Sequence, residues 1–137
     1  MVRLRRSYTF QAAHHLTKGV PEGHRYRRFH GHRYKLVVDV AGQPNDAGML
    51  AYPPALDLVL RPPLLLVEHH HLNTLNERCT TIEAGMVADN PTVERLLQWF
   101  VERLRGPVAS LRMDDPLRLV RVELEEDDTT SAVWGLE

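Results

Sequence analysis

The sequence contains little cysteine, no long apolar run and almost no net charge, and each shortage excludes a class of protein. Cys79 is the single cysteine, so neither an internal disulfide nor a cysteine-rich zinc site can form. The best apolar run, at 64–67, is far too short to span a membrane. Lys and Arg number 17 against 18 Asp and Glu, and this balance argues against a protein that binds nucleic acid over its whole surface.

What the sequence does contain is an ordinary globular composition with an excess of histidine. Its 137 residues are 43% hydrophobic and 26% charged, which predicts a single domain over 1–137. No apolar run follows the arginines near Met1, so the start does not resemble a secretion signal and a cytoplasmic protein is expected. Eight histidines are present, and all lie between His14 and His71.

The N-terminal half favours strands first and helices second. Alternating residues predict strands over 4–12 and 32–40, joined by a loop that contains Gly, Pro and several arginines. Residues 48–52 are expected to form a short third strand. Pro53 suits the first turn of a helix, which should end or kink at Pro62-Pro63, and a short helix is expected over 64–70.

The C-terminal half predicts one strong helix and a final pair of strands. Asn90 is a good N-cap, Pro91 fits the first helical position, and Gly106 with Pro107 should end the helix. Strands are expected over 117–126 and 129–134. This order of elements predicts an α+β fold, in which helices pack on one face of a mainly antiparallel sheet.

Three histidines are candidate metal ligands. His30 and His32 lie two apart at the start of a predicted strand, so both imidazoles point to the same side. If the first two strands pair, His14 at the end of the first strand comes beside them. Three neutral imidazoles with an open fourth position are typical of catalytic zinc. The alternative is that these are unrelated surface or core histidines.

Two carboxylates are candidates for other roles. Glu68 precedes His69, and a neighbouring carboxylate can make an imidazole a general base. The alternative is that Glu68 and His69 belong to an exposed polar helix end. Glu126 falls on the apolar face of a strand, where burial is costly unless it binds a guanidine-like donor edge. Alternatively, the strand ends at Leu124 and Glu126 is solvated within an acidic run.

Together these stretches resemble the 6-pyruvoyltetrahydropterin synthase family, and most closely its bacterial branch, 6-carboxytetrahydropterin synthase. The matching stretches occur in family order: YTFQAAHHL at 8–16, PEGH at 21–24, HGH at 30–32, EHHHLN at 68–73, NPTVE at 90–94, and 126–134. The resemblance implies a tunnelling fold with a four-stranded antiparallel sheet. It also implies that trimers close a β-barrel, that two trimers stack into a homohexamer, and that active sites lie between subunits.

The resemblance further implies a lyase that acts on 7,8-dihydroneopterin triphosphate, on the path to queuosine in the bacterial branch. It implies that His14, His30 and His32 bind Zn²⁺. Glu126 would anchor the pterin ring, Thr92 would contact the substrate, and Glu68 with His69 would form the acid–base pair. No nucleic acid or membrane partner is implied.

The position of a catalytic cysteine departs from the family pattern. Where the family has a proton-abstracting cysteine, this chain has Tyr26, and a phenol with a pKa near 10 is a poorer base than a thiol near 8.5. Alternatives to the lyase are therefore a zinc-holding pterin-binding protein with little turnover, or a dihydropterin aldolase of retro-aldol type. A generic zinc hydrolase is disfavoured, because it would need no acid for a pterin edge and no G-x-S-x-G motif is present.

Overall fold

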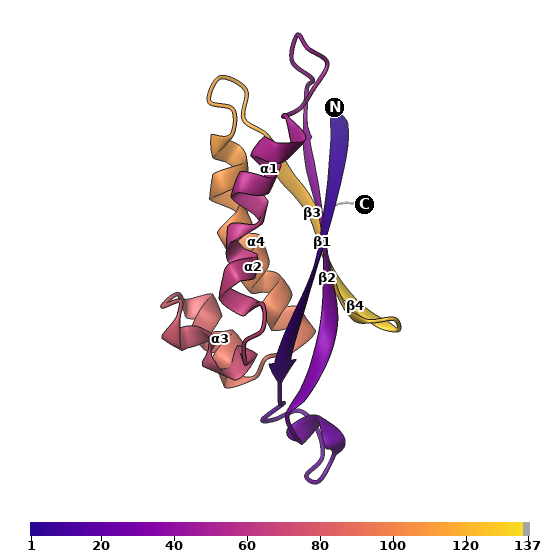
Figure 1. The fold of residues 1–137 in the computed structure, drawn as a ribbon, viewed down its shortest axis with the longest axis vertical. Helices are drawn as coiled ribbons and strands as arrows, with labels where there is room; N and C mark the ends of the chain where they lie inside the picture. The colour runs from indigo at the N-terminus through magenta and orange to yellow at the C-terminus, as the bar shows by residue number, and fades with distance from the viewer. Residues whose placement is uncertain (136–137) are drawn as a thin grey trace.

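The computed structural model describes residues 1–135 as one antiparallel sheet covered on one face by helices (Figure 1). The sheet has four strands in the order β1-β2-β3-β4. Their bounds are β1 Val2–His14, β2 His30–Gly42, β3 Arg118–Asp127 and β4 Thr130–Gly135. The helices are α1 Pro53–Leu60, α2 Pro62–Val67, α3 Ile82–Asp89 and α4 Val93–Ser110, with 3-10 turns η1 Arg25–Arg27 and η2 Leu72–Glu77. The predicted α+β class is confirmed.

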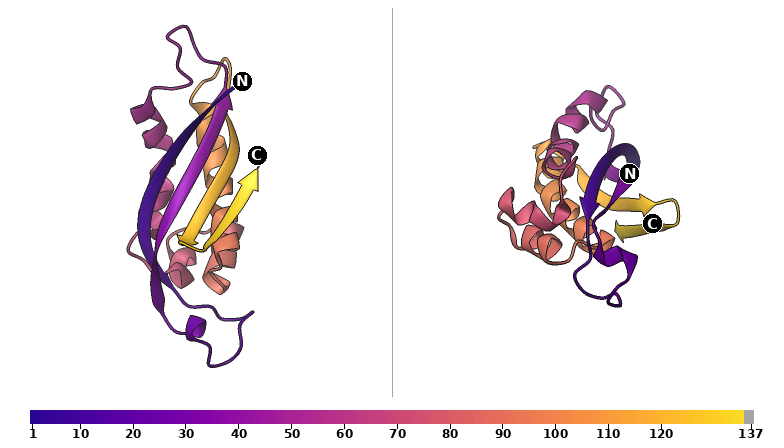
Figure 2. Two further views of the ribbon diagram at one scale, coloured as in Figure 1. Left: turned by 90° about the vertical axis from the view of Figure 1, so that its right-hand side faces the viewer. Right: turned by 60° about the horizontal axis from the view of Figure 1, so that its bottom comes forward.

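The two faces of the sheet differ because side chains alternate along each strand. Tyr8, Phe10, Tyr34 and Leu36 are buried on the face toward the helices. Figure 2 shows the four strands side by side, with all of the α-helices behind them. The opposite face is therefore free of helices within residues 1–135.

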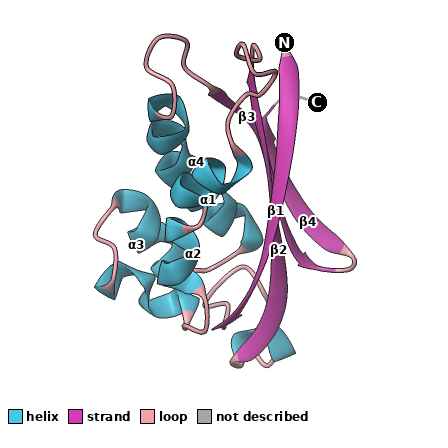
Figure 3. Ribbon diagram, turned by 45° about the horizontal axis from the view of Figure 1, so that its top comes forward, coloured by secondary structure: helices cyan, strands magenta, loops and turns pink. Residues whose placement is uncertain are grey.

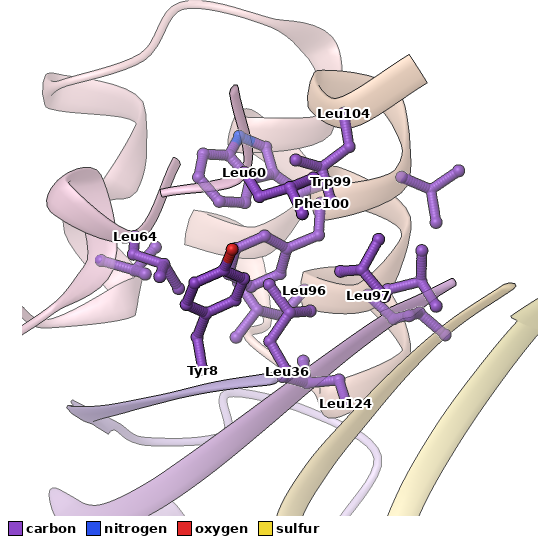
Figure 4. Close-up of a cluster of buried hydrophobic side chains, with 14 of the residues drawn as sticks. Tyr8, Leu36, Leu60, Leu64, Leu96, Leu97, Trp99, Phe100, Leu104 and Leu124 are labelled. Atoms are coloured by element: carbon purple, nitrogen blue, oxygen red, sulfur yellow. The ribbon is translucent and has the colours of Figure 1, made fainter. Parts of the chain in front are cut away.

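The core lies between the sheet and α4. The rings of Phe10 and Tyr34 stack at 4.9 Å, and Phe100 packs on Phe10 at 5.7 Å. Trp99 and Leu104 are also completely buried on α4, whose residues fill the centre of Figure 4. Stacked aromatic pairs and buried aliphatic area are the main stabilising terms in such a core. This packing fixes the sheet against α4, and so fixes the strand ends that carry the histidines.

The start of α4 corrects the predicted cap. Thr92, not Asn90, is the N-cap, because its hydroxyl accepts a hydrogen bond from the Arg95 N–H at 3.2 Å. Asn90 is instead extended and ends α3. Its side chain accepts from the Thr17 N–H and donates to the Lys18 carbonyl, so it anchors the loop after β1. An N-cap pattern cannot separate these two uses of an asparagine.

Other boundaries also differ from the predictions. Residues 48–52 form no strand: Asn45 accepts hydrogen bonds from the N–H groups of Ala47 and Met49 and closes a tight turn there. Helix α2 runs Pro62–Val67 rather than 64–70, since both prolines fit its first turn. Helix α4 continues through Gly106 and Pro107 to Ser110. Helix α3 was not predicted.

The pairing of β1 with β2 brings the predicted metal ligands to one end of the sheet. The register places His14 opposite His30 and Ala12 opposite His32. The loop with η1 projects beyond this end, as the colours of Figure 1 and the strand ends of Figure 3 show. Within residues 1–135, no helix combines the length and apolar character that crossing a bilayer requires.

Candidate metal centre and active site

The three predicted metal ligands meet at the end of β1 and β2. One nitrogen from each of His14, His30 and His32 lies within 4.8 Å of the others. The Nε2 atoms of His14 and His30 are 3.0 Å apart. His14 is 1% exposed, whereas the other two are partly exposed. The cluster is therefore buried on one side and open on the other.

Backbone carbonyls orient two of these imidazoles. The Nδ1–H of His14 donates to the Pro91 carbonyl at 2.7 Å, and that of His30 donates to the Arg28 carbonyl at 2.8 Å. These bonds favour the tautomer that carries the proton on Nδ1 and leaves the Nε2 lone pair toward the cluster. Carbonyl partners of this kind are usual behind metal-binding histidines. The donor set therefore fits a divalent transition metal.

Burial favours the neutral form of two of these imidazoles, those of His14 and His32. It lowers the pKa of His14 to about 4, with smaller contributions from the neighbouring histidines. Burial, followed by the nearby His30, also lowers the pKa of His32. Metal binding requires neutral imidazole, so the site is prepared for a cation at neutral pH.

Glu126 approaches the same cluster from β3. The register of β3 against β4 shifts between Glu125 and Asp127, and such an irregularity can redirect a side chain. The Oε1 atom of Glu126 lies 3.7 Å from Nε2 of His14 and 3.8 Å from Nε2 of His32. Burial, followed by the charge of Asp127, raises the pKa of this carboxyl. Glu126 is thus a partly buried member of the site and not a solvated strand end.

Glu68 and His69 lie on the segment that follows α2. The His69 N–H donates to the Gln11 carbonyl at 2.6 Å, and the Ala13 N–H donates to the His70 carbonyl at 3.1 Å, so this segment runs along the free edge of β1. The His69 side chain is 74% exposed and its Nε2 is 3.9 Å from Glu68 Oε1. His69 and His32 both line a cavity of about 600 Å³.

Tyr26 lies beside the candidate metal ligand His30. Its ring is 5.7 Å from that of His30 in a nearly parallel stack, and its carbonyl accepts from the Leu16 N–H at 2.8 Å. It lines a smaller cavity of about 250 Å³ together with Arg25, His30 and His32. Thr92 enters neither cavity. Its hydroxyl caps α4, one residue after the carbonyl that holds His14.

Two features of the site were not predicted. From the sequence, Tyr34 was assigned no role at the site, yet its ring lies 5.7 Å from His32 and its buried hydroxyl has no partner among the described residues. Burial, followed by the charge of Glu126, raises the pKa of Tyr34, so the phenol stays protonated and can donate. Asn73 donates to the His15 carbonyl and accepts from its N–H, which ties η2 to the end of β1. Because side chains alternate along β2, Tyr34 lies on the same face as His32, and the sequence pattern is sufficient to place it next to that histidine.

Comparison with known proteins agrees with this geometry. The 6-pyruvoyl tetrahydropterin synthase family matches residues 3–136, and the chain belongs to that family. Its fold is the tunnelling fold of these synthases.

Solved structures show the same fold at low sequence identity. A 6-pyruvoyl tetrahydropterin synthase of Caenorhabditis elegans is 21% identical with a TM-score of 0.74, covering 99% of this chain and 96% of that one. An uncharacterized protein, WS1659, of Wolinella succinogenes is 15% identical with a TM-score of 0.71, covering 99% and 98%. A Plasmodium vivax 6-pyruvoyltetrahydropterin synthase with a catalytic glutamate changed to alanine is 14% identical, with a TM-score of 0.61, covering 97% and 96%.

Proposed function

We propose that this protein is a zinc-dependent pterin lyase that resembles 6-carboxytetrahydropterin synthase. The observation that carries the proposal is the convergence of three imidazoles and one partly buried carboxylate at a single strand end. The proposed substrate is 7,8-dihydroneopterin triphosphate or a related reduced pterin. The proposed setting is queuosine formation or another pterin pathway in the cytoplasm.

His14, His30 and His32 would hold the zinc ion. When bound, zinc supplies Lewis acidity that makes protons beside the substrate's side-chain oxygens easier to remove. The Pro91 and Arg28 carbonyls support this role because they hold the His14 and His30 rings in the ligating tautomer.

Glu126 would accept hydrogen bonds from the guanidine-like edge of the pterin ring. A carboxylate matches two parallel N–H donors, and burial strengthens such a pair. No lysine or arginine within residues 1–135 forms an ion pair with Glu126, so the carboxylate is available for a ligand. Thr92 is proposed as a further substrate contact at the start of α4.

His69, paired with Glu68, would move protons between substrate and solvent. The Glu68 carboxylate lies at an ion-pair distance of 3.9 Å from the His69 imidazole, and His69 shares a cavity with His32. Tyr26 would at most assist, because an ordinary phenol remains protonated near neutral pH. The P. vivax synthase, whose catalytic residue is a glutamate, supports a member of this family that works without relying on a thiol.

A second candidate function is a zinc-holding pterin-binding protein with little turnover. The specific observation in its favour is Tyr26, whose ring stacks beside a metal ligand where a stronger base would help. A dihydropterin aldolase of retro-aldol type lies between the two candidates, since that cleavage needs fewer proton transfers.

A panel of reduced pterins, with products identified by mass, tests these functions. We expect weak or no synthase turnover of dihydroneopterin triphosphate by the natural chain, together with clear binding of reduced pterins. Tyr26→Cys should raise turnover, whereas Tyr26→Phe should change it little. If Tyr26→Phe abolishes a robust activity, the phenol is the working base and this interpretation of Tyr26 is wrong.

We also propose that the chain assembles through its sheet into trimers and, by stacking, a homohexamer. The helix-free face of the sheet and its two outer strands, β1 and β4, are consistent with this closure. Sedimentation at micromolar concentration should give a hexamer, or at least a trimer. A monomer alone would contradict the proposal and would also remove an active site shared between subunits.

A further inference from the structure

Cys79 is not part of the histidine cluster, and polar side chains surround its free thiol. It lies two positions before Thr81, the N-cap of α3. A guanidinium N–H of Arg103, on α4, donates to the Cys79 Sγ at 3.2 Å, and the Thr81 hydroxyl oxygen is 3.6 Å from the same sulfur. A cationic side chain and a helix N-terminus both stabilise a thiolate. The surroundings of Cys79 therefore suit a negatively charged sulfur.

The indole of Trp99 adds a buried donor that has no acceptor. Trp99 is completely buried on α4, among the side chains of Figure 4, and its Nε1–H has no hydrogen-bond partner among residues 1–135. Its side chain lies close enough to Cys79 to help lower the pKa of that thiol. The Arg103 guanidinium lies over the Trp99 ring, 5.5 Å from the ring centroid. A buried N–H without an acceptor is costly, and an oxygen atom attached to the sulfur would supply one.

The balance of influences on the thiol favours its ionised form. Burial is the largest influence and raises the pKa of Cys79, but the hydroxyl and N–H of Thr81, the Trp99 side chain and the charge of Arg103 together outweigh it. The pKa therefore lies below its ordinary value. Cys79 is 7% exposed, and Thr80 and Thr81 after it are exposed, so the residue lies at the edge of the core.

We propose that Cys79 is a site of reversible oxidation by peroxide, and that Trp99 and Arg103 hold the oxygen that its sulfur gains. The thiolate sulfur attacks one oxygen of hydrogen peroxide, the O–O bond breaks, and the other oxygen leaves as hydroxide, which takes up a proton from solvent to become water. The sulfur loses two electrons and becomes a sulfenate, while the peroxide is reduced.

The reverse step needs an added thiol. The chain has no second cysteine, so the sulfenate cannot condense to a disulfide within the chain. One added thiol instead displaces the sulfenate oxygen as water and forms a mixed disulfide with Cys79. A second thiol then releases the Cys79 thiol and leaves as the oxidised reagent. The modification therefore requires neither the metal centre nor a pterin.

The first experiment compares the folded natural chain with the same chain unfolded in urea. Each is treated with hydrogen peroxide, the peroxide is removed, and dimedone is added in urea to capture sulfenate for detection by mass. Capture in urea makes the access of dimedone equal in both samples, and the single cysteine assigns every adduct to Cys79. The folded chain should form sulfenate at least ten-fold faster, on the order of one unit of lowered thiol pKa.

The second experiment removes the charge beside the sulfur. Arg103→Gln should slow the oxidation about ten-fold, and Arg103→Lys, which keeps the charge, should lie between the two. Arg105→Gln is the matched control, since it removes the same charge from α4 at a position that faces Trp134 instead. It should stay within about two-fold of the natural chain. Circular dichroism checks that each variant is folded.

The third experiment tests the role of the indole. Trp134→Phe leaves Trp99 as the single tryptophan, so its fluorescence reports the environment of that ring alone. The emission should change when peroxide oxidises Cys79 and should return after excess dithiothreitol, because the added oxygen accepts the indole N–H only while it is present. In the same background, Cys79→Ser should show no change.

Three results would each overturn the proposal. One is oxidation that is no faster in the folded chain than in urea, and this comparison decides even if Arg103→Gln fails to fold. Another is equal slowing by Arg103→Gln and Arg105→Gln. The third is Trp99 emission that stays constant while Cys79 is oxidised, or oxidation that dithiothreitol does not reverse.

Discussion

The molecule has two clusters of three histidines, and they differ in almost every physical respect. His14, His30 and His32 project their nitrogens toward one point, and two of them are held from behind by backbone carbonyls. His69, His70 and His71 are consecutive, and among residues 1–135 no group of metal-binding side chains includes any of them. The two clusters have the same composition, so composition does not decide which one binds a metal.

Strand register accounts for the difference. His14 and His30 are direct partners across β1 and β2, and His32 lies one alternation further along the same face. The consecutive histidines follow a short helix along the edge of β1, where neighbouring side chains point in different directions. Convergence therefore comes from residues distant in sequence that the sheet brings together.

The largest effect is expected from a substitution that removes one histidine of the first cluster. His30→Ala should abolish zinc binding at micromolar protein, because two imidazoles hold the ion far more weakly than three. His71→Ala should bind zinc like the natural chain. Metal analysis after dialysis checks both variants. Retention of zinc by a variant that lacks both His30 and His32 would contradict the assignment of this centre.

The next effect tests the second cluster. His69→Gln should reduce turnover of whichever pterin is the substrate by about 10²- to 10⁴-fold, the usual contribution of a positioned acid or base. Zinc content should stay unchanged, since His69 is outside the metal cluster. His71→Gln is the control and should keep its activity. Equal losses in both variants would mean that the segment, and not the His69 imidazole, matters.

The smallest expected effect is on the stability of the metal-free protein, measured at two pH values. Because burial lowers the pKa of His14 to about 4, the folded state takes up this proton less readily than the unfolded chain, where the pKa is near 6.5. Stability linked to His14 is therefore complete above pH 6.5 and declines as the pH falls toward 4, by about 3 kcal/mol. Urea unfolding with a chelator should show a shallower decline for His14→Gln. If stability falls equally with pH in the natural chain and in His14→Gln, the decline does not come from His14.

The fold was predictable where the sequence pattern is local. Alternation gave the two long strands and the C-terminal pair, and apolar spacing gave α4. Side-chain hydrogen bonds account for two of the errors: Asn45 accepts from the Met49 N–H, which extends its turn into the strand expected over 48–52, and Asn90 binds the loop after β1 in place of capping a helix. The contacts of Asn90 with Thr17 and Lys18 are long-range, so its use depends on the fold, whereas Asn45 binds N–H groups only two and four residues ahead.

The cluster of His14, His30 and His32 was predictable because side chains alternate along a strand and β1 pairs with β2. The position of Glu126 at the site was harder to predict. A register shift beside it sets the direction of its side chain, and no pattern in the acidic run marks that shift. The carbonyls of Pro91 and Arg28 carry no sequence signal at all. A backbone acceptor is the same for every residue, and only the fold selects which one faces an imidazole.

The backbone at His69 has a consequence for redesigning this protein. Its φ of 58° lies in the left-handed region, where a residue with a Cβ costs about 1–2 kcal/mol more than in an ordinary conformation. Glycine adopts this conformation without that cost. A procedure that selects only for thermal stability would therefore favour His69→Gly, and would erase the exposed imidazole beside Glu68 while raising the melting temperature. Position 69 is where optimising stability and retaining chemistry demand different residues.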